Sequence, residues 1–126
     1  ILTFYGFMRA IKQRDFDFII GTEALLVPAV VAGAKGCVSG VANTFPELMV
    51  ELWNAAKAGE MDKAMALQQR VNRIREIMHL SNSIISMHAM LQARGIDGGI
   101  PRRPLLPATD DLVAEIKERL KALQLI

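Results

Sequence analysis

The chain has 126 residues, 52% of them hydrophobic, and its 15 basic and 13 acidic side chains leave a net charge of +2. This small charge argues against a nucleic-acid surface. No apolar run approaches the roughly 18 residues of a membrane span, so we expect a soluble protein without membrane partners. The single cysteine, Cys37, cannot form an intramolecular disulfide and indicates a cytoplasmic protein.

The first half of the chain reads as alternating helices and strands. Residues 1–14 predict a helix that carries Leu2, Tyr5, Met8 and Ile11 on one side. Two compact apolar runs follow, at residues 16–20 and 37–39, and both resemble buried parallel strands. The segment from Glu23 to Ala34 between them has helix-forming composition. Helix, strand, helix and strand therefore predict a βαβ unit in which the two strands are adjacent and parallel.

The second half reads as helices alone. We expect a helix from about Thr44 that stops at Gly59, because glycine commonly ends helices. A long amphipathic helix should follow over residues 61–78, with Met61, Ala64, Met65, Leu67, Val71, Ile74, Ile77 and Met78 at helical spacing. Two more are predicted at residues 83–95 and 110–124, the last with Val113, Ile116, Leu120 and Leu123 facing inward.

Two phrases of the sequence carry a family resemblance. GTEALLVPAVVAGAKGCVSGVAN, at residues 21–43, and PRRPLLP, at residues 101–107, resemble the C-terminal part of the dihydrodipicolinate synthase and N-acetylneuraminate lyase family. Those proteins are class I aldolases, built on a (β/α)8 barrel with a C-terminal helical extension. The resemblance implies an α/β fold and a lyase that forms a Schiff base between a lysine and pyruvate or another 2-oxo acid, then makes or breaks a carbon–carbon bond.

The length of the chain fits only part of such an enzyme. A (β/α)8 barrel needs about 250 residues, and only two strands are visible here. We therefore expect roughly the second half of a barrel enzyme, with residues 1–58 as the end of the barrel and residues 59–126 as the helical extension. The first half would be missing, disordered or present as another polypeptide.

The candidate substrate-binding residues follow the two predicted strands, since the loops after the strands build the active face of a barrel. They are Gly21, Thr22 and Glu23 after the first strand and Val38, Ser39 and Gly40 after the second. The resemblance implies that the residues matching Gly21 and Val38 lend backbone groups near the 2-oxo acid. It also implies that Thr22, Glu23 and Gly40 vary with the second substrate, and glycine at position 40 departs from the sialic acid lyases, which place a hydroxyl there.

Each of these residues also has a purely structural interpretation. Gly21 and Gly40 could be tight strand exits. Glu23 could favour the positive end of the helix that it opens, an effect of about 0.3 to 1 kcal/mol. Asn43 and Thr44 read as turn and cap residues. The sequence leaves these alternatives open.

The Schiff-base lysine is not expected in this chain. It requires a dry pocket that keeps its amine neutral, whereas the six lysines fall at helix ends, in a turn or on polar helix faces. The resemblance places this lysine, and the proton-shuttling tyrosine, upstream. His79 and His88 have no carboxylate at metal-ligand spacing, so neither a metal nor a cofactor is expected.

Two hypotheses of function remain. The first is the C-terminal part of a 2-oxo-acid lyase that assembles with the other barrel half into a homo-oligomer. We expect a dimer or a tetramer, because the resembled family is often tetrameric. The second is a non-enzymatic helical module for interaction or oligomerisation, because helices dominate from Thr44 onward.

Overall fold

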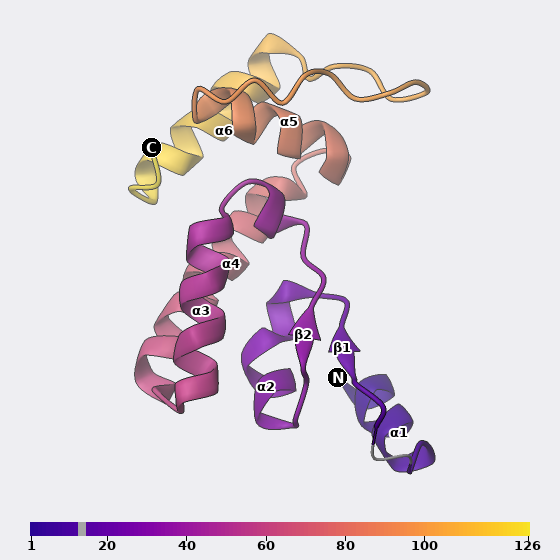
Figure 1. Ribbon diagram of the computed structural model, residues 1–126. Helices are drawn as coiled ribbons and strands as arrows, with labels where there is room; N and C mark the ends of the chain where they lie inside the picture. Colours follow the sequence, from indigo (N-terminus) through magenta and orange to yellow (C-terminus); the bar gives the residue numbers. More distant parts are fainter. Residues whose placement is uncertain (13–14) are drawn as a thin grey trace. The chain divides into compact units, whose positions relative to one another are not determined.

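The computed structural model describes residues 1–12 and 15–126 (Figure 1). The chain divides into two compact units, Ile1–Val71 and Asn72–Ile126, which are described separately. The boundary between the end of the barrel and the helical extension, placed after residue 58, stays a prediction.

The first unit contains a parallel strand pair, β1 (Ile19–Ile20) and β2 (Gly36–Cys37). Ile19 lies opposite Gly36 and Ile20 opposite Cys37, and Figure 1 shows the two arrows side by side in the same direction. The predicted parallel pairing is therefore confirmed. Both strands are shorter than predicted, because each has only the other as a ladder partner in the described chain.

The connection between the strands is not the single helix predicted over residues 23–34. It consists of a 3-10 turn, η1 (Glu23–Leu25), and a short helix, α2 (Leu26–Val31). The chain then leaves α2 through Gly33, whose φ of 103° favours glycine. The Ala34 N–H bonds the Ala29 carbonyl at 2.8 Å and so closes this exit before β2.

A small apolar core joins helix α1 (Leu2–Ala10) to the strand pair and α2. Its buried members are Phe4, Ile20, Ala29 and Ala34. The predicted apolar side of α1 is not wholly buried, because Leu2 and Tyr5 are 83% and 42% exposed. Phe4 packs inward instead, and Met8, one turn later, lies against the same cluster. The helix ends before residue 14, and residues 13–14 lie outside the described residues.

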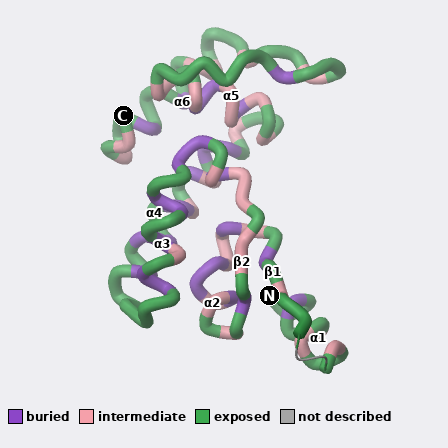
Figure 2. The backbone as a smooth tube through the Cα atoms, viewed as in Figure 1, coloured by how far each residue is buried: buried purple, intermediate pink, exposed green. Residues whose placement is uncertain are grey.

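Three further helical segments complete the first unit and lead into the second. The turn η2 (Val41–Asn43) precedes α3 (Pro46–Ala58), which ends at the left-handed Gly59 with a φ of 76°, as predicted. Helix α4 (Met61–Met78) also confirms its prediction, with Ala64, Leu67 and Val71 buried along one side. Buried and exposed positions alternate along it in Figure 2. Met61 and Met65, predicted on the apolar side, are exposed.

The second unit begins with the last turns of α4 and contains α5 (Ser83–Ala93) and α6 (Asp110–Ala122), which pack against each other. Their N-termini are capped by side chains: Asn82 accepts from the Ile84 N–H at 3.0 Å and Thr109 from the Leu112 N–H at 3.3 Å. Ile116 and Leu120 are fully buried, as predicted, whereas Val113 and Leu123 are half-buried.

Candidate functional site

The loops that carry the candidate residues begin at the same end of the strand pair. Ile20 pairs with Cys37, so Gly21 and Val38 are the next residues of two parallel strands. The Val38 N–H donates to the Ile20 carbonyl at 2.9 Å, which prolongs the ladder to the beginning of both loops. The structure thus brings together the two segments that contain all six candidates, and their binding of a substrate stays a prediction.

The strand pair has one covered face and one bare face. Ile20 points into the apolar core and is only 7% exposed. On the other face Ile19 is 57% exposed, and its side chain lies 3.6 Å from where a Cβ on Gly36 would stand. Val38, two residues beyond Gly36, is 70% exposed. Because parallel strands are normally buried on both faces, we expect further protein to cover this face.

The backbone conformation does not require glycine at either Gly21 or Gly40. Gly40 has φ −65° and ψ −42°, a right-handed conformation that any residue adopts. A Cβ added to Gly21 would meet no heavy atom within 4 Å among the described residues. The tight-exit interpretation therefore has no support at Gly40. Absence of a side chain at Gly21 leaves open space at the end of β1.

The loop after β2 is held by its own side chains. The Ser39 hydroxyl accepts a hydrogen bond from the Ala42 N–H at 3.2 Å. The Asn43 amide donates to the carbonyls of Ser39 and Gly40 at 3.4 and 3.2 Å. The Thr44 hydroxyl donates to the Val41 carbonyl at 3.1 Å. These bonds fix the backbone of the loop, and they agree with the turn interpretation of Asn43. The cap interpretation of Thr44 is wrong, because the N-cap residue of α3 is Phe45, which makes no side-chain cap bond, and the Thr44 hydroxyl points back to Val41.

Glu23, after β1, acts electrostatically on Cys37 of β2. Glu23 is 4% exposed, although a carboxylate at a helix start is commonly solvated. Cys37 is half-buried beside the apolar core. Burial, and secondly the negative charge of Glu23, raise the pKa of the Cys37 thiol to about 11. The thiol is therefore protonated at neutral pH and unsuited to nucleophilic chemistry.

Cys37 should react slowly with thiol reagents. At pH 8 a thiol of pKa about 11 is almost wholly protonated, so we expect its rate with an aromatic disulfide to be at least about tenfold below that of free cysteine. The rate should keep rising beyond pH 10. Stopped-flow measurements on the chain at low concentration test this. Glu23→Gln should shift the pH profile of the rate toward lower pH, whereas Glu60→Gln, an exposed control, should not. An unchanged profile in Glu23→Gln would exclude the carboxylate as a cause of the raised thiol pKa.

Gln68 is a residue that the sequence analysis missed. It lies on α4 and is 3% exposed. Its amide nitrogen donates to the Glu23 carbonyl at 2.8 Å, and its amide oxygen accepts from the Val27 N–H at 3.1 Å. Its position in the sequence could have identified it, because Gln68 falls on the buried side of α4, between Ala64 and Val71. A polar amide there needs partners of its own.

The lysines and histidines carry no catalytic arrangement. All six lysines are exposed: Lys12, Lys35, Lys57, Lys63, Lys117 and Lys121. His79 contacts the Ser83 hydroxyl at 3.4 Å, and His88 contacts the Gly99 carbonyl at 3.0 Å. No group of three potential metal ligands occurs among residues 1–12 and 15–126. No helix in this part of the chain is long and apolar enough to cross a membrane.

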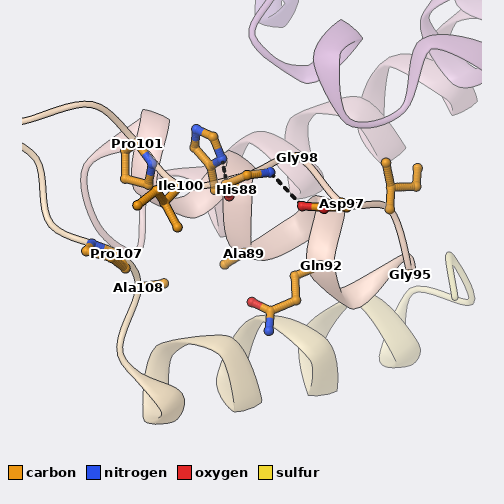
Figure 3. A pocket seen from close by; sticks show the side chains of 12 residues that line it. His88, Ala89, Gln92, Gly95, Asp97, Gly98, Ile100, Pro101, Pro107 and Ala108 are labelled. Carbon is orange, nitrogen blue, oxygen red and sulfur yellow. Dashed lines mark hydrogen bonds between the residues drawn. The ribbon is translucent and has the colours of Figure 1, made fainter.

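A cavity of about 460 Å³ lies within the second unit, between α5 and the loop that follows it (Figure 3). His88, Gln92 and Asp97 are among its polar lining residues. His88 bonds the loop, and Asp97 accepts from the Gly99 N–H at 2.9 Å, so both polar groups hold the loop in place. None of the six candidate residues lines this cavity.

Comparison with known proteins agrees with this architecture. A solved dihydrodipicolinate synthase from Bacteroides thetaiotaomicron is 31% identical, with a TM-score of 0.87 over 96% of this chain. A 2-keto-3-deoxygluconate aldolase variant from Sulfolobus solfataricus has a TM-score of 0.89 over 98% of the chain, and at 22% identity it shows the fold alone. The 4-hydroxy-tetrahydrodipicolinate synthase of Archaeoglobus fulgidus is 31% identical over 112 residues.

The parallel strand pair with its helices is the C-terminal part of a (β/α)8 barrel, followed by a helical extension. The profile of the dihydrodipicolinate synthetase family matches residues 5–123, and the chain belongs to this family. The chain spans 39% of the Archaeoglobus relative and 43% of the Bacteroides structure. The predicted family and fold class are confirmed.

Proposed function

We propose that this chain is the C-terminal part of a Schiff-base lyase that condenses or cleaves pyruvate, or a related 2-oxo acid, with an aldehyde. Family membership supports the lyase class over the helical-module hypothesis. The observation that carries the proposal is the strand pair with one bare apolar face, whose two loops start at the same end. In a barrel this face lies inside, and the loops form part of the active rim.

Within this proposal the candidate residues have separate roles. Gly21 and Val38 offer backbone groups close to the 2-oxo acid, and the open space at Gly21 is compatible with a ligand there. Thr22, Glu23 and Gly40 shape the site for the second substrate, Glu23 from a buried position. The catalytic lysine belongs to the other half of the barrel, which is consistent with six exposed lysines here.

The other barrel half is the partner that we propose first. Cys37 and Ser39 line a groove of about 360 Å³ beside β2, together with Met49 and Trp53 of α3. An unpaired strand edge beside an apolar groove favours addition of another strand. Residues 1–58 would complete the barrel, and residues 59–126 would form the extension. We also propose a cytoplasmic homo-oligomer, a dimer or a tetramer; the single cysteine supports the location.

Turnover by the complete enzyme tests the function. We expect pyruvate to be consumed with at least one aldehyde from a panel that includes aspartate semialdehyde and sugar aldehydes, without added metal or cofactor. A matched panel without aldehyde controls for pyruvate loss. If no pair of 2-oxo acid and aldehyde reacts, in condensation or in cleavage, the proposal is overturned.

A further inference from the structure

The amide of Gln68 replaces a backbone hydrogen bond at the start of the connection between β1 and β2. In a continuous α-helix the Val27 N–H would donate to the carbonyl four residues earlier, which is Glu23. Here the Gln68 oxygen receives the Val27 N–H at 3.1 Å, and the Gln68 nitrogen donates to the Glu23 carbonyl at 2.8 Å. The side-chain amide is thus inserted between the two backbone groups.

This insertion accounts for the shape of the turn. The Glu23 carbonyl also accepts from the Leu26 N–H, a bond of the 3-10 type. The segment is accordingly split into η1 (Glu23–Leu25) and α2 (Leu26–Val31). Insertion of a side chain into the helical ladder is a recognised cause of such breaks. Gln68 therefore lies at the break between η1 and α2 and holds it.

The bridge is buried and connects distant parts of the sequence. Gln68 is 3% exposed, and it is separated from Glu23 by 45 residues in sequence. Both of its amide atoms are used, and a buried amide that loses its partners costs about 1 to 3 kcal/mol. Thr22 immediately precedes the held carbonyl, and Glu23 bears it.

We infer that Gln68, on the helix that begins the extension, is a positioning residue that determines specificity for the second substrate by holding Thr22 and Glu23 at the rim. The inference rests on the proposed function, because that function assigns these two residues to the second substrate. Gln68 reaches the rim through the backbone of Glu23 and Val27.

Gln68→Met in the complete enzyme tests the inference, with Gln69→Met, an exposed neighbour on α4, as the matched control. Methionine keeps the size and removes both bonds. We expect the KM for the aldehyde to rise about tenfold, as loss of a buried hydrogen bond allows. The KM for pyruvate and the rate of borohydride-trapped adduct formation should stay within about twofold of the wild type, and the control should change none of them.

Two further measurements separate the possible failures. Amide exchange at Val27 should be slow in the wild type and faster in Gln68→Met; fast exchange in the wild type would overturn the inference even if the variant does not fold. Gln68→Asn, whose amide is one methylene short of both the Glu23 carbonyl and the Val27 N–H, should also raise the aldehyde KM. A wild type that forms no pyruvate adduct overturns the proposed function instead. A wild type that forms the adduct, with an unchanged aldehyde KM in Gln68→Met, overturns the role of Gln68 alone.

Discussion

Borohydride reduction in the presence of pyruvate is expected to leave the isolated chain unmodified. Attack on the carbonyl requires a neutral amine. All six lysines of this chain are exposed, and none lies in the desolvated pocket that activates a lysine for this attack. Intact mass and peptide mapping after a short incubation should therefore show no adduct.

The complete enzyme is the positive control for this experiment. Under the same conditions it should be trapped at one lysine outside this chain, because a desolvated lysine with a lowered pKa reacts far faster. Free N-acetyl-lysine gives the background rate. Rapid modification of Lys35, which lies closest in sequence to β2, would move the catalytic amine into this half of the barrel and refute the proposed division.

Replacement of Ile19 by lysine is expected to have opposite effects in the isolated chain and in the complete enzyme. In the isolated chain Ile19 is 57% exposed on the bare face of the strand pair. A charge there should reduce self-association, which exposed apolar strands otherwise promote. In a complete barrel the same side chain would lie in the packed interior, where an unpaired charge is very costly. Ile19→Lys should therefore prevent folding of the complete enzyme.

Sedimentation of the isolated chain and expression of the complete enzyme measure the two effects. Val31→Lys is the control, since Val31 is 67% exposed at the end of α2 and lies outside the strand pair. It should leave the complete enzyme folded. A monodisperse wild-type chain with strongly protected amides in β1 and β2, or a folded and active Ile19→Lys enzyme, would show that the bare face is not a barrel interior.

Patterns within short stretches of sequence were sufficient to predict much of the fold. The apolar runs around Ile20 and Cys37 predicted parallel strands, and Gly59 predicted the end of α3; both predictions are confirmed. The inward side of α1 could not be predicted, because apolar residues occur on several sides of it. Only contact with the strand pair selects Phe4 over Leu2 and Tyr5.

The candidate site was predictable only where it follows directly from the strands. Gly21 and Val38 follow from the strand ends, whereas the break in the helix after Glu23 depends on Gln68, 45 residues away. No local propensity reports such a distant partner. Similarly, the burial of Glu23 and the raised pKa of Cys37 arise from tertiary packing.

The place of the strand pair in the C-terminal part of the barrel has a consequence for biosynthesis. A ribosome makes the N-terminal part of a protein first, and domains generally fold as units. As the C-terminal part of the barrel, β1 and β2 would leave the ribosome after the other strands, so the barrel could not close until synthesis was nearly finished. Until then the earlier strands would expose an open edge. Ribosome-bound intermediates that end before Gly36 should accordingly be the species that chaperones bind most strongly.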